Sequence, residues 1–383
     1  MNRSQNRNPS LDFIRSLAIL MVCWVHSVNR IYSFTLKGMN SLSTGSFVFG
    51  NVAHALGQMG VPLFLMLSGY LLLSREYNSF DDVKAFWKKK LIPLLICFEI
   101  WVALYELFAV FVVKLKPFSL GEWVRHSLML QEFKYLRHMW YIPAIIGIYL
   151  FIPLLSIVLH KLPAKAFVLP LLAGYFYFFL VPTLNIFLGP TGHTLLSSRI
   201  NISYMGAHNG MLVLFGYFFK ICLEPRLLKI DRKGLCAFLF ALCSVLTAVL
   251  TGAILCWSYR HNAAITVQYS NALLPLFGLS LFSAVFLIGD RIPFSKLWRS
   301  VSLASFGIYF FHYPIMLWIL DHFTDKLSVL KRPLGVLLLS AIIFLSAYLI
   351  VVILSHLLPG VAKVLFLRKP KSKKEKALSE NLS

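Results

Sequence analysis

Long apolar stretches follow one another along almost the whole chain, and their length constrains the fold more than any other feature. A membrane-spanning α-helix needs about 20 consecutive apolar residues, because the hydrocarbon core is about 30 Å thick and a helix rises about 1.5 Å per residue. Ten stretches come close to this length, at residues 11–30, 52–73, 91–113, 139–159, 166–188, 204–223, 235–257, 270–289, 300–320 and 334–358. The sequence therefore predicts an all-α, polytopic integral membrane protein with about ten transmembrane helices.

Composition favours the same class. Of the 383 residues, 58% are hydrophobic and 14% are charged, whereas soluble domains carry about 25% charged residues. The net charge of +22 raises the question of nucleic-acid binding. The basic residues, however, lie in short patches between the apolar stretches, which is typical of membrane topology. We expect the lipid bilayer as a partner, and no nucleic acid.

The charge distribution also predicts an orientation. With ten spans both termini lie on one side, and most of the 37 Lys and Arg residues fall in the terminal segments and in the loops of that side. The positive-inside rule then places both termini in the cytoplasm. Residues 1–362 form one membrane domain in this interpretation. Residues 363–383 form a basic, disordered cytoplasmic tail that meets anionic lipid headgroups or a specific partner.

Two ionisable residues stand inside the first apolar stretch, LDFIRSLAILMVCWVHSV. Arg15 and His26 are eleven residues apart, so three helical turns bring them to one face of a helix, about 16 Å apart along its axis. Ionisable groups are costly at membrane depth and persist mainly where they face a protein interior or a water-filled path. The pair therefore indicates a functional site. A snorkelling Arg15 with an interfacial His26 is the structural alternative.

Several polar residues share the outer level with His26 in this topology. His312 falls in the outer half of its helix, and His54 and His138 lie at the outer mouths of theirs. An imidazole backed by a carboxylate can act as a general base on a hydroxyl. We predict His26 as this base, with Glu106 as its carboxylate. For His54 and His138 taken singly, interfacial hydrogen bonding is the alternative.

Basic residues gather on the predicted cytoplasmic side. The second helix ends in GVPLFLMLSGYLLLSREY, with the small pair Ser68 and Gly69, and the next begins FWKKKLIPLL. The basic residues of this segment are Arg75, Lys88, Lys89 and Lys90. Small residues let a helix or a slender ligand approach closely, and Lys and Arg side chains bind phosphates. The segment is a candidate phosphate site, and membrane orientation by positive charge is the alternative.

These motifs resemble, in order, those of the acyltransferase-3 family, ten-helix membrane acyltransferases that modify bacterial surface glycans. Arg15 and His26 match its R-x10-H signature, and VPLFLMLSGYLLL at 61–73 matches its second-helix SGF/SGY motif. FWKKKLIP at 86–93 resembles the basic segment that follows, although it is compressed and has Lys where Arg is common. HMWYIP, from His138, resembles the H-x-W-Y helix start. SFGIYFFHYPIM at 305–316 matches the S-x-x-IY-x-x-H-x-P pattern.

The resemblance implies a membrane O-acyltransferase of the bacterial inner membrane, most similar to the enterobacterial common antigen O-acetyltransferase type. Its donor substrate would be acyl-CoA, with acetyl-CoA first, bound on the cytoplasmic side. Its acceptor would be a hydroxyl of a cell-surface glycan or lipid-linked sugar at the outer face. A stand-alone membrane enzyme without an appended esterase-like domain is expected.

The resemblance also assigns roles to the matching positions. The donor-binding positions are Arg15, Ser68, Tyr70, Arg75, Lys88, Lys89 and Lys90. The sugar-binding positions are His138, Trp140, Tyr141, Tyr309 and His312. His26 and Arg15 are catalytic, with Glu106 added by its expected depth, and His26 either deprotonates the acceptor hydroxyl or carries the acyl group. No bound cofactor or metal is expected, since the six cysteines show neither metal-ligand nor disulfide spacing.

Two other classes of membrane protein remain open. A secondary transporter also has intramembrane charges, but inverted repeats and pairs of broken helices are typical of it, and no such symmetry is visible in the sequence. A ligand-sensing membrane module on the same fold is the stronger rival, because fold alone does not establish activity. Acyl-CoA hydrolysis would separate the enzyme from the sensor.

Overall fold

The computed structural model describes residues 7–197, 200, 206–262, 269–328 and 331–367. Every regular element within these residues is a helix, so the predicted all-α class is confirmed. Eight segments are long and apolar enough to cross a membrane: Pro9–Ile31, Thr44–Leu73, Phe80–Val112, Arg137–Lys161, Ala164–Leu188, Lys233–Arg260, Ser295–Phe323 and Arg332–Leu357.

Two of the ten expected spans correspond to shorter helices. α11 (Ala207–Phe218) continues through η8 (Phe219–Leu223) into α12 (Glu224–Leu227), and its expected start at residue 204 lies outside the described residues. α14 (Leu273–Ile288) has 16 residues, which at 1.5 Å per residue extend about 24 Å, less than the hydrocarbon core of about 30 Å. Within the described residues the number of full-length spans is therefore eight rather than ten.

Three of the spans are built from consecutive helices. The second contains α3 (Thr44–Gln58), α4 (Gly60–Ser68) and the π-helical turn η1 (Gly69–Leu73). The third contains α5 (Phe80–Phe86), η2 (Trp87–Leu91), α6 (Ile92–Leu107) and η3 (Phe108–Val112). The fifth contains η5 (Ala164–Phe167), α9 (Val168–Tyr175), η6 (Phe176–Leu180) and α10 (Val181–Leu188). π-helical turns often mark functional sites. Here η1 contains Gly69, and η2 contains the three lysines of the candidate phosphate site, Lys88, Lys89 and Lys90.

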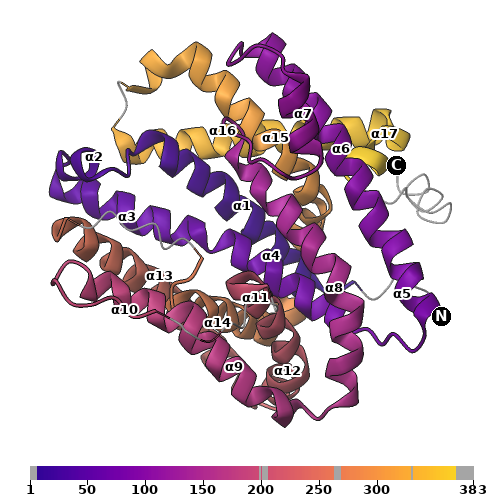
Figure 1. Cartoon of the computed structure of the whole chain (residues 1–383). Helices are drawn as coiled ribbons and strands as arrows, with labels where there is room; N and C mark the ends of the chain where they lie inside the picture. The colour runs from indigo at the N-terminus through magenta and orange to yellow at the C-terminus, as the bar shows by residue number, and fades with distance from the viewer. Residues whose placement is uncertain (1–6, 198–199, 201–205, 263–268, 329–330, 368–383) are drawn as a thin grey trace.

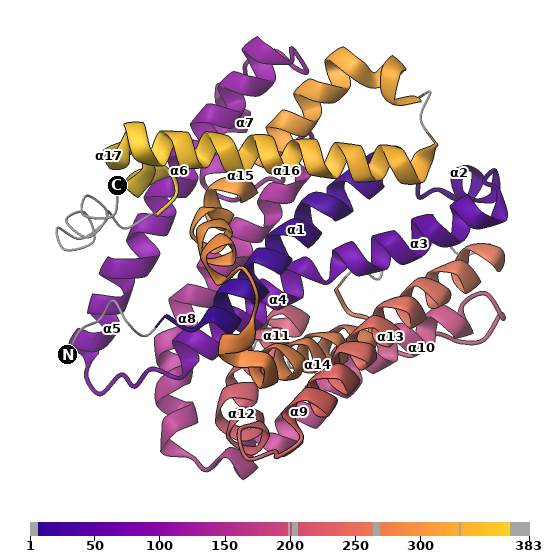
Figure 2. The ribbon, with the colours of Figure 1, turned by 180° about the vertical axis from the view of Figure 1, so that it is seen from behind.

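The remaining spans are simpler. They are α1 (Pro9–Ile31), η4 with α8 (Arg137–Trp140 and Tyr141–Lys161), α13 (Lys233–Arg260), α15 (Ser295–Ser328) and α16 (Arg332–Leu357). The short elements are α2 (Leu36–Asn40), α7 (Leu120–Ser127), η9 (Gly289–Arg291) and α17 (Pro359–Leu365). In Figures 1 and 2, α2 and α5 lie on opposite sides of the molecule.

α1 lies at the centre of the helix assembly (Figures 1 and 2). Its start is set by Asn8, whose side chain accepts a hydrogen bond from the backbone N–H of Ser10, and by a proline at the first helical position. It packs against α3, α4, α14, α15 and α16. This enclosure suits a helix that carries Arg15 and His26, because lipid contact would leave both groups in hydrocarbon.

A buried carboxylate fastens the beginning of α1 to α15. Asp12 accepts hydrogen bonds from Arg7 Nη2 at 2.6 Å and from the hydroxyl of Ser302 at 2.7 Å. Arg15 Nη1 in turn lies 3.2 Å from the same hydroxyl. Because Ser302 belongs to α15, these bonds set how α1 and α15 lie against each other along their length.

The end of the described chain is packed. Trp101 on α6 donates its indole N–H to the carbonyl of Leu365 at 3.0 Å, and Phe366 is buried with its ring 5.9 Å from that of Phe311. The predicted start of the disordered tail, residue 363, lies within α17. Burial of Phe366 holds this segment against the helices. Residues 368–383 lie outside the described residues.

Two glycines allow α4 and η1 to cross α11 at very short range. A Cβ atom added at Gly69 would lie 1.7 Å from the carbonyl oxygen of Val213, and one added at Gly216 would lie 1.9 Å from that of Met66. The obstacle in both cases is backbone, which cannot move away as a flexible side chain does. The small residues of the SGY segment thus serve a helix crossing, as their size suggested.

We expect Gly69→Ala to lower the free energy of unfolding by about 1–3 kcal/mol or more, because the added methyl overpacks this crossing. The matched control is Gly147→Ala on α8, where an added Cβ meets nothing within 4 Å. Thermal unfolding of both purified variants in one detergent, followed by loss of the monodisperse peak, measures the difference. Equal stability of the two variants would contradict the tight crossing.

Candidate active site

Three histidines from three spans meet in the half of α1 that leads to α2. The ring centroids of His26 and His312 lie 5.1 Å apart, those of His138 and His312 5.2 Å, and those of His26 and His138 6.3 Å. His138 and His312 are buried, whereas His26 is partly exposed. The ring of Tyr313 stacks on His138 at 4.5 Å and meets His26 edge-on at 5.1 Å. These four residues are called the histidine cluster.

Neighbouring groups determine which ring nitrogen of two cluster histidines carries the proton. Nδ1 of His312 lies 2.6 Å from the backbone carbonyl oxygen of Tyr309, which can only accept, so Nδ1 donates. Tyr105 donates its hydroxyl to the carbonyl of Phe310 at 2.6 Å, and its oxygen lies 3.1 Å from Nε2 of His138. Since the hydroxyl hydrogen is already used, Nε2 of His138 is the donor in that contact.

In the neutral rings the lone pairs therefore lie on Nδ1 of His138 and on Nε2 of His312. Both atoms are buried, and neither has a hydrogen-bond partner in the described part of the chain. A buried acceptor without a partner costs about 1–3 kcal/mol, so each favours a ligand that brings a hydrogen donor. A hydroxyl group is such a donor, whereas an ionised carboxylate is not. The cluster suits a substrate hydroxyl beside a nitrogen base.

A cavity of about 490 Å³ lies beside Arg15, toward the start of α1. Its basic side chains are Arg15, Arg75, Lys89, Lys90 and Lys363. Much of the remaining wall is apolar and includes Phe64, Leu67, Leu71, Ile145 and Phe306. This space, called the cationic cavity, suits a long ligand that has a phosphorylated end and a less polar arm.

Two tyrosines connect the cationic cavity with the histidine cluster. Tyr141 and Tyr309 both line the cavity, and their ring centroids lie 5.7 Å apart. The ring of Tyr309 also lies 5.4 Å from His138 and 5.9 Å from His312, and its hydroxyl donates to the backbone carbonyl of His138. A ligand that follows the cavity to its tyrosine wall is therefore separated from the cluster by one side chain.

Arg15 lines the cavity and has hydrogen-bond donors that its described neighbours do not use. Its Nη1 lies 3.2 Å from the hydroxyl of Ser302 and 4.0 Å from Asp12, whose carboxylate is held more closely by Arg7 at 2.6 Å. A guanidinium group has five N–H donors in a planar fork, a geometry that matches phosphate oxygens. Arg15 is thus positioned by α15 and still able to bind an anion.

The sequence profile of the acyltransferase-3 acyltransferase domain matches residues 8–356, which includes every residue of the histidine cluster and all but one of the basic residues of the cavity. The chain belongs to the acyltransferase-3 family. It is therefore a membrane acyltransferase. Comparisons with curated proteins and with solved structures gave no match.

The structure unites most of the residues that the sequence singled out in this acyltransferase. His26, His138 and His312 converge as expected. The predicted donor residues Arg15, Ser68, Arg75, Lys89 and Lys90 line the cationic cavity. Tyr141 and Tyr309, predicted at the sugar site, line the same cavity. His54 stands apart, because its two ring nitrogens pair with Asn29 at 2.7 Å and Gln58 at 3.0 Å.

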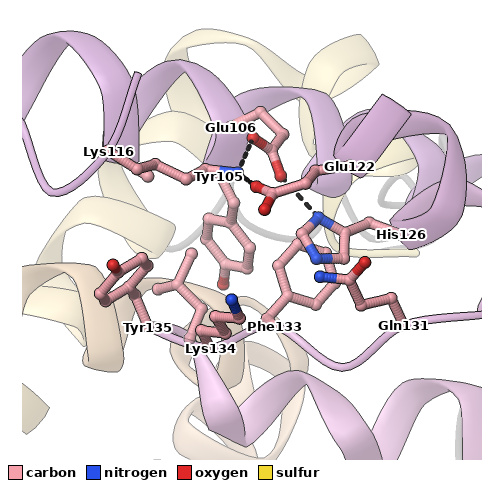
Figure 3. A pocket seen from close by; sticks show the side chains of 11 residues that line it. Tyr105, Glu106, Lys116, Glu122, His126, Gln131, Phe133, Lys134 and Tyr135 are labelled. Atoms are coloured by element: carbon pink, nitrogen blue, oxygen red, sulfur yellow. Dashed lines mark hydrogen bonds and ion pairs between the residues drawn. The ribbon is translucent and has the colours of Figure 1, made fainter. Parts of the chain in front are cut away.

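Glu106 does not back His26, contrary to the prediction. Its carboxylate lies 2.6 Å from Nδ1 of His126 and 2.7 Å from Nζ of Lys116 (Figure 3). The expected pairing was inferred from depth alone. The helix rotation of α6 instead turns Tyr105 toward His138 and Glu106 toward α7, since neighbouring residues on a helix point about 100° apart.

Two predicted donor residues, Tyr70 and Lys88, and one predicted sugar residue, Trp140, are not among the residues that line the cationic cavity. Tyr70 donates its hydroxyl to Glu224 at 2.8 Å and so faces α12. Lys88 is exposed beside the cavity-lining Lys89, again because successive helical positions diverge. Trp140 packs with its ring 5.2 Å from that of Tyr269.

Four site residues were missed by sequence reasoning. Tyr313 directly follows His312 in the FHYP motif, and this adjacency is the signal that could have identified it. Tyr105 precedes Glu106, the residue that depth arguments chose instead. Tyr149 also lines the cavity. Lys363 carries no sequence signal, because it reaches the cavity only through the return of the chain in α17.

We expect Tyr105→Phe to reduce the transfer rate of the acyltransferase by about tenfold or more, because His138 loses the oxygen that fixes its protonated nitrogen. The free energy of unfolding should fall by about 1 kcal/mol, the usual value of one hydrogen bond. The pH–rate profile tests the positioning role. Loss of positioning should change the shape of this profile, whereas a purely structural defect would leave its shape unchanged. Tyr32→Phe is the control, since that hydroxyl pairs with Ser46 away from the cluster. An unaltered rate and profile in Tyr105→Phe would contradict this role.

Proposed function

We propose that this acyltransferase is an O-acyltransferase that moves an acyl group from acyl-CoA to a hydroxyl of a cell-surface glycan or lipid-linked sugar. Acetyl-CoA is the proposed donor and O-acetylation the proposed reaction. The observation that carries the proposal is that Tyr309 lines the cationic cavity and also packs against His138 and His312, so that a single side chain separates the two regions. A donor site and an acceptor site must meet at one reacting carbonyl, and this side chain belongs to both.

The cationic cavity is the proposed site of acyl-CoA. Its basic side chains suit the phosphates of the CoA nucleotide, with Arg15 as the planar fork and the lysines as point charges. The apolar wall suits the pantetheine arm, which would bring the thioester toward Tyr141 and Tyr309. Ser68 and Tyr149 both line the cavity and offer hydroxyl groups along this arm.

The histidine cluster is the proposed site of the acceptor hydroxyl. Two buried lone pairs, on His138 and His312, accept hydrogen bonds from the sugar hydroxyls and so orient them. His26, the partly exposed member, takes the proton of the reacting hydroxyl as its oxygen attacks the thioester carbonyl carbon. The C–S bond then breaks, an ester forms, and the CoA thiolate leaves and takes up a proton. Direct transfer and transient acylation of His26 both use this arrangement.

The proposed location is the bacterial inner membrane, with both termini and the cationic cavity on the cytoplasmic side. Acyl-CoA is then available to the basic end, and the acceptor approaches from the outer face. The distribution of Lys and Arg along the chain supports this orientation. Arg15 and His26, about 16 Å apart along α1, bracket the path of the acyl group.

Transfer of radiolabelled acetyl from acetyl-CoA to membrane glycolipids in vesicles tests the reaction. We expect label with the unchanged protein and at least a 100-fold loss with His26→Ala, because removing a general base typically costs 10²–10⁴ in rate. His54→Ala is the matched control, because His54 lies on α3 and forms its hydrogen bonds outside the cluster. Full activity of His26→Ala would exclude the mechanism. No label with any protein would reject acetyl-CoA as the donor and favour another acyl donor or a sensing module.

Adjacent lysines allow a test of the donor site. Lys89→Ala should raise the KM for acetyl-CoA by up to about fivefold, since an exposed charge contact contributes up to about 1 kcal/mol. Lys88→Ala, which removes the same charge outside the cavity, should leave this KM unchanged. The difference should shrink as salt concentration rises. Equal KM values for both variants would remove Lys89 from the donor site.

A further inference from the structure

A second, smaller pocket lies between α6, α7 and the segment that leads to His138 (Figure 3). Its polar side chains are Glu106, Lys116, Glu122, His126, Gln131 and Lys134. Three aromatic side chains, Tyr105, Phe133 and Tyr135, provide the other walls. We call this space the α7 pocket. The proposed mechanism uses none of its polar groups.

A buried imidazole in the α7 pocket has one nitrogen without a partner. His126 is 4% exposed, and its Nδ1 lies 2.6 Å from the Glu106 carboxylate, to which it donates. Its ring is held flat against Phe133, with centroids 4.1 Å apart. Nε2 has no hydrogen-bond partner within the described residues. Whether this nitrogen carries a lone pair or a proton, a hydroxyl group can pair with it, because a hydroxyl both donates and accepts.

The charges of the α7 pocket balance one another. Lys116 Nζ lies 2.7 Å from Glu106 and 2.7 Å from Glu122. Burial opposes the charge on Lys116, but its hydrogen bonds to Glu106 and Glu122 raise its pKa. The hydrogen bond from Lys116 also lowers the pKa of Glu122. With Lys134, the pocket carries two carboxylates and two ammonium groups, which favours a neutral polar ligand over an anion such as phosphate.

Size and position restrict the ligand further. The cavity volume is about 70 Å³, room for about two water molecules, which is enough for a hydroxymethyl group but not for a sugar ring. Tyr105 forms part of the wall, and its hydroxyl contacts His138 on the other side at 3.1 Å. Leu136, also in the wall, is two residues from His138. The Tyr105 side chain thus stands between the α7 pocket and the histidine cluster.

We infer that the α7 pocket is an acceptor subsite that binds an exocyclic hydroxymethyl group of a neutral sugar, while another hydroxyl of the same glycan lies at the histidine cluster. This inference rests on the proposed function for the identity of the acceptor. His126 and Gln131 pair with the hydroxyl, and Tyr135 at the exposed rim packs on the sugar ring. Gln131 is oriented for this purpose by Arg125, which donates to its Oε1 at 2.7 Å and leaves its amide N–H groups available.

Binding without turnover tests the subsite. The probes are methyl glycosides of glucose, galactose, mannose and N-acetylglucosamine, titrated at millimolar concentration into His26→Ala protein in nanodiscs and followed by tryptophan fluorescence. For the tightest glycoside, we expect Gln131→Ala and His126→Phe, each added to His26→Ala, to raise the Kd about tenfold, the equivalent of one lost hydrogen bond. Glu132→Gln, an exposed change in the same segment, should leave the Kd unaltered.

The 6-deoxy analogue of that glycoside makes the test specific. This analogue lacks only the hydroxyl that the pocket is proposed to bind. Its Kd for His26→Ala protein should be about tenfold higher than the Kd of the parent glycoside. For the double variant His26→Ala with Gln131→Ala, its Kd should not exceed that of the parent glycoside. If His126→Phe fails to fold, Gln131→Ala decides alone. Equal affinity for the parent and 6-deoxy glycosides, or no binding by any of the four, would overturn the subsite.

The subsite and the proposed function can fail separately. Glycoside binding that depends on Gln131, in a protein that transfers no acetyl, would retain the subsite and reject the transferase reaction. Acetyl transfer with the same acceptor KM in the unchanged protein and in Gln131→Ala would retain the reaction and reject the subsite.

Discussion

The cost of placing ionisable side chains at membrane depth governs the architecture around α1. Arg15 and His26 lie within one span, and a helix with this pair is stable only when other helices surround it. The assembly meets this demand by packing five helices around α1. The buried Asp12 then joins α1 to α15 through Ser302. This contact lies near Arg15, and the same helix pair brings His26 to His312 further along.

The two ends of the site differ in chemistry because their polar atoms differ. Near Arg15, guanidinium and ammonium groups offer only hydrogen donors, so an anionic ligand is favoured. At the histidine cluster, the bonds of His138 and His312 to neighbouring groups leave buried acceptors, so a hydroxyl is favoured. Tyr309 touches both regions. A reaction between a phosphorylated donor and a hydroxyl acceptor fits this division.

Sequence reasoning succeeded where one helix sufficed to relate two residues. The spacing of Arg15 and His26 required only the geometry of a single helix. The motif around His312 likewise placed Tyr309 and His312 relative to each other within one helix. It failed where helix rotation mattered. Glu106 was assigned to His26 from depth, yet Tyr105, its neighbour, is the residue that turns toward the cluster. Depth follows from position along a span, whereas the direction of a side chain depends on how the whole helix is packed.

The sequence by itself determined the all-α membrane class, the family and most positions of the histidine cluster and cationic cavity, because apolar length and local motifs are properties of consecutive residues. Only the tertiary structure decided which polar groups pair. Glu106 with His126, Tyr105 with His138, and Lys363 at the cavity each join segments distant in the chain. Their partners are chosen by helix rotation and by the return of α17, and no local pattern encodes either.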